Sequence, residues 1–201
     1  RDRYPLATSI VPPGFTGWSK DMSLPFDLAA AKKSMVATGL DPARIPPIEL
    51  VTSRFDYLVA LAEFVAGELK KNLGLRTSIN VIEVKNYSST ILNGQGVPMA
   101  IFDSTAKNPD SDHLYSRLLA ASAPNESFWS NPKYDEWILS ARLQASPAER
   151  AKQYQNAERI LADDAVLIPL YYGQNWALIR AGLKGPQPNP IRGILYRELS
   201  M

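Results

Sequence analysis

The residues best suited to chemistry lie in the polar loop from Phe102 to Asp110, which follows the apolar run 99–102. The run predicts a short strand, and the loop begins with Asp103, Ser104 and Thr105. In an open α/β sheet, polar groups at the carboxyl ends of the strands face the ligand crevice. This loop is therefore the candidate ligand-binding site. The residues leave one alternative open, a solvated loop in which Asp and Asn side chains serve turns.

Aromatic residues near the end of the chain form a second candidate. Tyr171 and Tyr172 end an apolar run that begins at Val166 and predicts a strand buried on both faces. Neighbouring side chains of a strand point to opposite faces, so at least one of these aromatics must leave the core. Tyr171, Tyr172 and the following Trp176 are candidates for lining a cleft, with plain core packing as the alternative. Arg54 is either a ligand-facing cation or a surface residue.

Catalytic and cofactor chemistry is not predicted. Asp110, Asp112 and His113 lack a fourth metal ligand at suitable spacing, and aspartates just before a helix are usually caps, so no metal site is predicted. The only histidine has no Gly-x-Ser-x-Gly elbow to accompany it. Gly94 and Gly96 lack the third glycine and the Lys-Ser/Thr of a phosphate loop. We therefore expect no enzyme, no cofactor and no bound metal.

Helical and strand patterns alternate along the chain. Asp27 caps one helix that Gly39 stops, Gly74 ends another, Asn131-Pro132 begins a third, and Ser146-Pro147 with Glu149 begins a fourth as a capping box. Strands alternating with helices predict an α/β fold of four to five mostly parallel strands with helices on both faces. The predicted helices are 28–37, about 56–73, 87–92, 111–120, 132–144 and 147–162, and the predicted strands are 48–52, 79–84, 99–102, 166–172 and 174–182.

Composition restricts the possible partners. The 201 residues have a net charge of +2, with 22 basic and 20 acidic residues interleaved, so there is no footprint for nucleic acid. No apolar stretch approaches the roughly 20 residues of a membrane span, so direct membrane insertion is not expected. Cysteine is absent, which removes disulfides and thiol chemistry.

Three segments carry a resemblance to a known family. Residues 130–135 read S-N-P-x-Y-D, residues 147–161 read P-A-E-R-x-x-x-Y-x-x-A-E-x-I-L, and residues 163–172 read D-D-A-x-x-I-P-L-Y-Y. In this order they resemble the C-terminal lobe of extracytoplasmic solute-binding proteins of the peptide/nickel (oligopeptide- and dipeptide-binding) ABC importer family. The resemblance implies one lobe of a type II periplasmic-binding-protein-like two-lobe fold. It also implies a periplasmic or extracytoplasmic location.

The same resemblance implies a function and a domain layout. The chain would be part of an importer's substrate-binding component, capturing an oligopeptide or similar solute between two lobes and delivering it to ABC permease subunits. Residues 1–172 would form the C-terminal ligand-binding lobe, and residues 173–201 a crossover strand and tail that return to the other lobe. Because the family's chains are more than twice as long, we expect a fragment. The alternatives are a regulatory or enzymatic domain that uses this lobe, or an importer component for a non-peptide solute such as an opine or a sugar conjugate.

The candidate loop resembles the family's W-x-x-D-Y-x-D-P segment. With Pro109 at the motif's proline, Phe102 takes the place of the tryptophan, and Thr105 that of the aspartate that pairs with a peptide's ammonium group. Asp103 supplies this carboxylate only if the loop is shifted. Otherwise a solute without a free ammonium group is favoured, because an unpaired buried charge is costly.

Overall fold

The computed structural model describes residues 4–22, 24–93, 97–106, 110–122, 125, 127–174, 178 and 180–184, with backbone only for 92 and 93. These residues belong to two compact units. The first, the helical unit, draws on 1–24, 105–123 and 129–201, and the second, the sheet unit, draws on 25–104 and 124–128. Each unit is described by itself.

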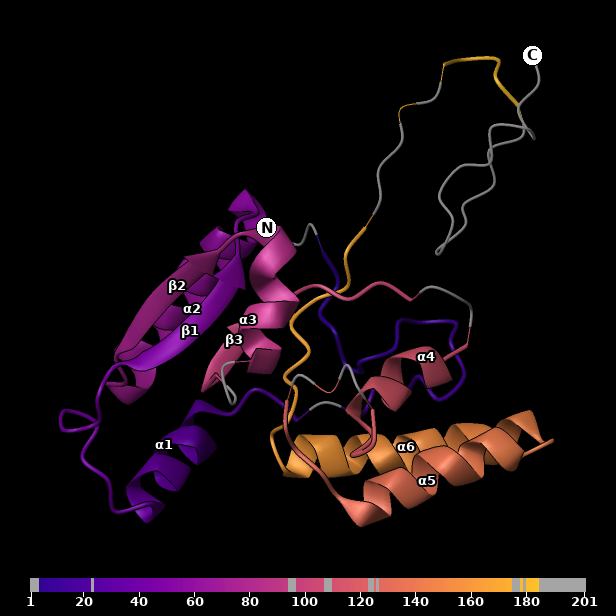
Figure 1. Ribbon diagram of the computed structural model, residues 1–201, viewed down its shortest axis with the longest axis horizontal. Helices are drawn as coiled ribbons and strands as arrows, with labels where there is room; N and C mark the ends of the chain where they lie inside the picture. Colours follow the sequence, from indigo (N-terminus) through magenta and orange to yellow (C-terminus); the bar gives the residue numbers. More distant parts are fainter. Residues whose placement is uncertain are drawn as a thin grey trace. The chain divides into compact units, whose positions relative to one another are not determined.

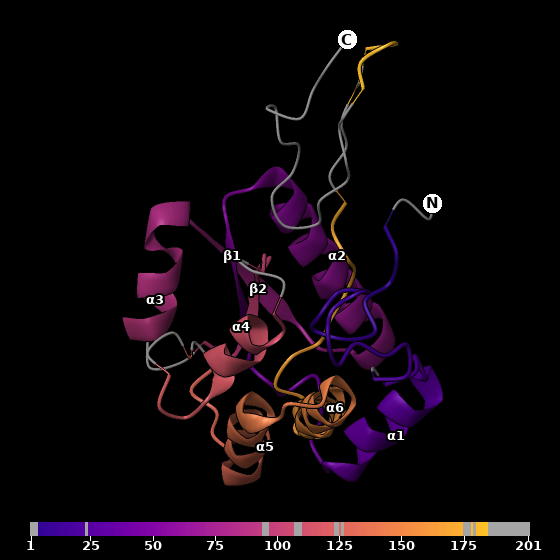
Figure 2. The same cartoon turned by 90° about the vertical axis from the view of Figure 1, so that its right-hand side faces the viewer.

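The sheet unit is built on three parallel strands in the order β2-β1-β3. The strands are β1 (Ile48–Ser53), β2 (Thr77–Ile82) and β3 (Met99–Ile101), and the helices are α1 (Leu28–Ala37), α2 (Asp56–Leu73), the 3-10 turn η1 (Val84–Asn86) and α3 (Tyr87–Asn93). Helices connect the strands, as parallel pairing requires. Figure 2 shows α2 and α3 on opposite sides of the strands, so the predicted α/β class with a parallel sheet and helices on both faces is confirmed.

Alternation along β1 explains why both faces are covered. Leu50 packs with Leu58 and Ala62 of α2, whereas the next residue, Val51, packs on the opposite face in a cluster that contains Ile91 of α3. Leu50, Val51, Leu58, Ala62 and Ile91 are all at most 2 % exposed. The central strand is therefore buried on both faces, as is typical of parallel strands covered by helices.

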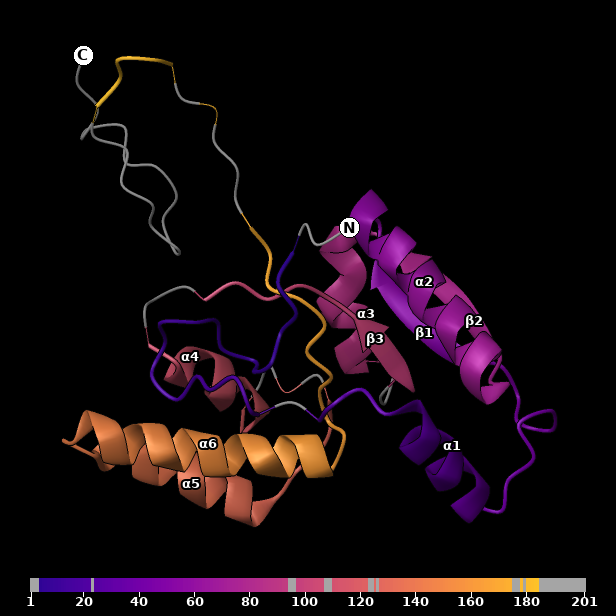
Figure 3. The ribbon, with the colours of Figure 1, turned by 180° about the vertical axis from the view of Figure 1, so that it is seen from behind.

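The helical unit contains α4 (Asp112–Tyr115), the 3-10 turn η2 (Ser116–Leu118), α5 (Pro132–Leu143) and α6 (Pro147–Asp163). Figures 1 and 3 show α5 and α6 lying side by side. Both helices start as predicted, at Pro132 and Pro147. The Asn131 side chain accepts hydrogen bonds from Lys133 N and Tyr134 N, and the Ser146 side chain accepts one from Glu149 N. The core of this unit is rich in fully buried residues: Val11, Tyr115, Tyr134, Ile138, Ala141, Tyr154 and Ala157.

Two predicted elements of the helical unit are wrong. The run 166–172 is not a strand buried on both faces: it makes one isolated antiparallel bridge, Tyr171 with Leu6, and Ile168 is 75 % exposed. Pro169 has no N–H to donate to a ladder, which favours an irregular course. The helix predicted over 111–120 is also shorter, because α4 gives way to the 3-10 turn at Ser116.

The strand predicted over 174–182 lies mostly outside the described residues, and so does Trp176. In the part of the chain that the structure does describe, no helix combines the length and the apolar character needed to cross a bilayer.

Candidate functional site

The carboxyl edge of the parallel sheet brings together several of the predicted site residues. Leu50 pairs with Met99 and Thr52 with Ile101, so the ends of β1 and β3 lie next to each other. Directly after these ends come Arg54 on β1 and Phe102-Asp103-Ser104 on β3. The same edge receives Glu83, which follows β2. A row of charged and polar groups therefore crosses the position where open α/β sheets bind ligands.

Arg54 lies at the centre of this row and is already ion-paired. Its Nη1 lies 3.0 Å from Oε1 of Glu83, and its backbone N–H donates to the carbonyl of Ile82 at 3.0 Å. The two charged side chains are 67 % and 51 % exposed, so the pair adds little stability by itself. It does hold the guanidinium group beside the end of β2.

The end of β3 is fixed from two sides. The Thr52 hydroxyl donates to the carbonyl of Ile101 at 3.4 Å, and the Tyr87 hydroxyl donates to the same carbonyl at 3.2 Å. Phe102, which follows, is 39 % exposed, and Asp103 is exposed. The backbone that leads into the candidate loop is therefore held, and its first side chains are accessible to a solute.

The other predicted site residues belong to the helical unit. Thr105 is exposed, Trp176 lies outside the described residues, and so do residues 107–109 of the candidate loop. Tyr171 and Tyr172 are both half-buried and stand next to each other at the bridge with Leu6. The structure thus groups Arg54 with 102–104 in one unit and the two tyrosines in the other.

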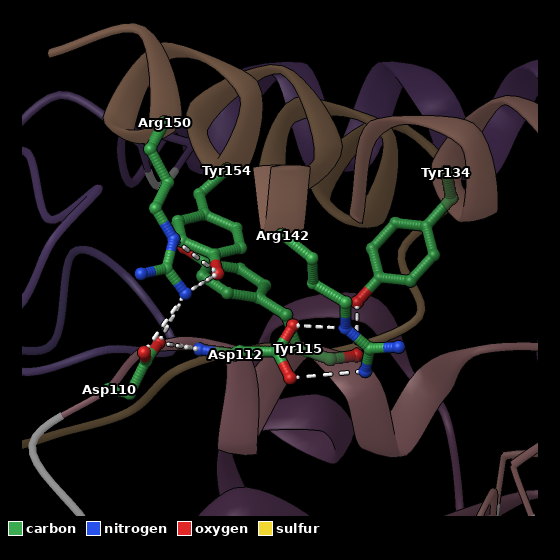
Figure 4. Close-up of polar contacts among 7 residues, drawn as sticks. All are labelled: Asp110, Asp112, Tyr115, Tyr134, Arg142, Arg150 and Tyr154. Carbon is green, nitrogen blue, oxygen red and sulfur yellow. Dashed lines mark hydrogen bonds and ion pairs between the residues drawn. The ribbon is translucent and has the colours of Figure 1, made fainter. Parts of the chain in front are cut away.

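Two ion pairs that the sequence analysis did not predict lie at the end of the candidate loop and at the start of α4 (Figure 4). Arg142 of α5 donates from Nε and Nη2 to the carboxylate oxygens of Asp112, at 2.8 and 3.0 Å. Arg150 of α6 donates from Nη2 to both oxygens of Asp110, each at 2.9 Å. A hollow of about 350 Å³ beside these pairs is lined by Asp110, Asp112, His113, Ser116, Arg142 and Arg150.

Asp110 and Asp112 are therefore both held by arginine side chains of the helical unit. Asp110 also accepts the backbone N–H of Asp112 at 2.9 Å, which is the turn contact expected just before a helix. The hydrogen bonds to Asp112 raise the pKa of Arg142. Burial lowers the pKa of Arg150, but its hydrogen bonds to Tyr154 and Asp110 outweigh burial and leave the pKa raised. Both arginines are charged, and both carboxylates are paired with them.

A buried carboxylate is the other feature that sequence reasoning missed. Glu158 of α6 is 4 % exposed and accepts hydrogen bonds from the Ser9 hydroxyl, the Tyr115 hydroxyl and the backbone N–H of Ile10. The spacing in the sequence does indicate this burial, because Glu158 follows Tyr154 by four residues and precedes Leu161 by three. It therefore shares the buried face of α6 with both.

Comparisons with known proteins were made on the sequence and on the fold. No protein-family model matches the sequence. The probable deoxycholate-binding periplasmic protein YgiS of Escherichia coli is 27 % identical over 201 residues, covering 96 % of this chain and 37 % of that protein. The periplasmic oligopeptide-binding protein OppA of Salmonella typhimurium is 26 % identical over 198 residues, covering 98 % of this chain and 35 % of that protein.

Among solved structures, the murein tripeptide-binding protein MppA of Escherichia coli matches with a TM-score of 0.82 at 23 % identity, covering 98 % of this chain and 40 % of that protein. The fold thus defines the class, type II periplasmic-binding-protein-like. The chain is a homologue of the periplasmic solute-binding proteins of the oligopeptide- and dipeptide-binding group. The predicted resemblance to this group is confirmed, and these relatives are named as periplasmic proteins. The chain spans little more than a third of the length of these relatives.

Proposed function

We propose that this chain is part of the substrate-binding component of an ABC-type importer, which captures an oligopeptide or similar solute and delivers it to permease subunits. The observation that carries the proposal is the carboxyl edge of the sheet, where Arg54, Phe102 and Asp103 gather at the usual ligand position of open α/β sheets. The proteins named in the comparisons are binding proteins, which supports capture without chemical turnover.

The proposal assigns different roles to two parts of the chain. Residues 1–172 form the ligand-binding lobe, and 173–201 lead to the other lobe, which supplies the opposite wall of the cleft. A solute needs both walls to lose most of its contact with water. The 201-residue chain should therefore bind its solute much more weakly than the full-length protein in calorimetry. Equal affinities would contradict this layout.

A thermal-shift screen of the full-length protein tests the function. Di- to pentapeptides should raise the melting temperature, and Asp103→Ala should remove most of that shift if Asp103 pairs with the ligand's ammonium group. Glu63→Ala is the matched control, because Glu63 is an exposed acid on α2 of the same unit. Stabilisation by no peptide would contradict the peptide proposal.

The same screen separates peptides from other solutes. Deoxycholate belongs in it because one relative is named as a probable deoxycholate-binding protein, and Thr105 stands where the resemblance expects the ammonium-pairing carboxylate. A response to deoxycholate, an opine or a sugar conjugate, with none to peptides, would assign the importer to a non-peptide solute. Equal stabilisation of wild type, Asp103→Ala and Thr105→Ala by peptides would remove these two residues from the site.

A further inference from the structure

Two segments from opposite ends of the chain form a short ribbon in the helical unit, namely 5–7 paired with 170–172. Ala7 N donates to the carbonyl of Leu170 at 3.3 Å, and Tyr172 N donates to the carbonyl of Pro5 at 2.9 Å. This pattern flanks Leu6 and Tyr171, which are directly opposite each other with their side chains on one face. That face is accessible, since Leu6 is 80 % exposed.

The two tyrosines therefore face opposite ways on this ribbon. Tyr171 shares the accessible face with Leu6, and its ring lies 5.1 Å from the ring of Tyr4, which is 41 % exposed. Tyr172, the next residue, turns to the other face and reaches the segment that follows the ribbon, residues 8–11. Both tyrosines are half-buried, but only Tyr171 lies on the face of the ribbon that carries the exposed Leu6.

The Tyr172 hydroxyl holds residues 8–11 from one side. It accepts the backbone N–H groups of Thr8 and Ser9, at 3.3 and 3.0 Å. The carbonyl oxygens of Ser9 and Val11 each lie 3.1 Å from it, and the hydroxyl donates its single proton to one of the two at a time. One side chain thus satisfies several backbone groups of a segment that has no regular structure.

Glu158 holds the same segment through other groups. Its Oε2 accepts the Ser9 hydroxyl at 2.7 Å and the Tyr115 hydroxyl at 2.5 Å, and its Oε1 accepts the Ile10 backbone N–H at 2.8 Å. Hydrogen bonds to a charged group in a buried place are stronger and more directional than those to a neutral one. Residues 8–11 are thereby fixed to α6 by Glu158 and to the end of the ribbon by Tyr172.

We propose that Glu158 and Tyr172 are positioning residues, which fix the ribbon through residues 8–11 and so determine where the ring of Tyr171 stands. The inference rests on the proposed function in that Tyr171 is taken as a ligand-facing aromatic. Neither positioning residue contacts the solute. Both act through the backbone that carries Leu6, the direct partner of Tyr171.

The placement of Tyr171 can be measured without any ligand. In the full-length protein, 3-fluorotyrosine is introduced at position 171 and its ¹⁹F resonance is recorded in wild type, Tyr172→Phe and Glu158→Ala. Tyr4→Ala serves as the reference, since it removes the neighbouring ring and shows how far the resonance moves when that contact is lost. In a second set, the probe stands at position 87, in the core of the sheet unit.

Tyr172→Phe and Glu158→Ala should each move the resonance at 171 in the direction of its position in urea, while the probe at 87 stays at its native position. Glu158→Gln keeps two of the three accepting contacts and should lie between wild type and Glu158→Ala. An unchanged resonance at 171 in Tyr172→Phe would overturn the proposal, and so would equal movement of both probes, which indicates general loosening. If Glu158→Ala unfolds the protein, Tyr172→Phe decides, because it removes only one hydroxyl group.

This result does not depend on whether a solute binds. A thermal-shift screen in which no solute stabilises the protein would refute the proposed function without affecting the ¹⁹F result. Conversely, a solute that loses affinity on Tyr171→Ala but not on Tyr172→Phe would leave the proposed function intact and refute the role of the positioning residues.

Discussion

Replacing Glu158 by alanine should be among the most destabilising single changes in the helical unit. The substitution leaves three donors without their acceptor: the hydroxyls of Ser9 and Tyr115 and the N–H of Ile10. Ser9 is 1 % exposed and Tyr115 fully buried, so water reaches them poorly. At roughly 1 kcal/mol for each buried donor left unsatisfied, the expected loss is about 3 kcal/mol.

The loss is measured by urea denaturation of the full-length protein, followed by circular dichroism at neutral pH. Lys152→Ala is the matched control, because Lys152 is exposed on the same helix and should change the free energy of unfolding by no more than about 0.5 kcal/mol. If Glu158→Ala lowers the free energy of unfolding by less than about 1 kcal/mol, the three donors must find other acceptors. That result would refute the claim that they are left unsatisfied.

The dependence of stability on pH tests the charge of the same residue. Burial raises the pKa of Glu158, although hydrogen bonds from Tyr115, Ser9 and Ile10 act in the opposite sense. The pKa values of the facing Tyr115 and Tyr134 are raised, chiefly by burial, so both stay protonated. A carboxyl group with a raised pKa contributes its full stability below the unfolded value of about 4.3, and this contribution is lost as pH rises through the folded value.

Glu158→Gln cannot ionise and should therefore lack this loss. Its free energy of unfolding relative to wild type should increase between about pH 4 and pH 7. Urea titrations at a series of pH values check this, and parallel curves for the two proteins would contradict a raised pKa.

Two further changes follow from local geometry. Gly14 and Gly17 both have φ of +91°, but only at Gly17 would a Cβ meet Tyr154, 2.8 Å from its Cβ. Gly14→Ala should therefore lower the free energy of unfolding by about 1 kcal/mol, and Gly17→Ala should lower it by at least about 1 kcal/mol more, as measured by urea denaturation. Equal losses for the two variants would show that the loop moves away from Tyr154 freely. Arg142→Gln breaks a bidentate pair with Asp112, in which the two side chains are 40 % and 24 % exposed. The substitution should therefore lower the free energy of unfolding by about 1 kcal/mol or less, and this loss should become smaller in high salt. A larger loss that salt does not change would contradict a solvent-screened pair.

Local signals in the sequence were sufficient for most of the elements. Asp27 accepts the N–H of Ala30 at 2.9 Å, and Gly39 and Gly74 have φ of +68° and +71°, as cap and stop residues should. Each of these effects acts within one turn of helix. The β1–β3 edge with Asp103 followed from the same local reasoning, because parallel strands end at a common edge.

Longer-range partners could not be read in this way. Asp110 and Arg150 are forty residues apart, and nothing in their spacing selects one arginine among the 22 basic residues. The run 166–172 shows the opposite error, since its apolar character was taken for a strand. Pro169 cannot donate to a ladder, and among the described residues the run pairs only through the bridge at Tyr171. Apolar sequence predicts burial only where a partner surface exists.

Hydrogen–deuterium exchange of the full-length protein, with and without the solute that stabilises it most in the thermal-shift screen, tests the central claim most directly. The carboxyl ends of the three strands are the predicted site, and the amino ends of the same strands serve as the control. The account predicts slower exchange at the carboxyl edge, in peptides covering 53–56, 82–85 and 101–105, and no change at the opposite edge, in peptides covering 46–49 and 75–78. Protection at the opposite edge alone, or at neither edge with any solute of the screen, would contradict a ligand site at the carboxyl ends of these strands.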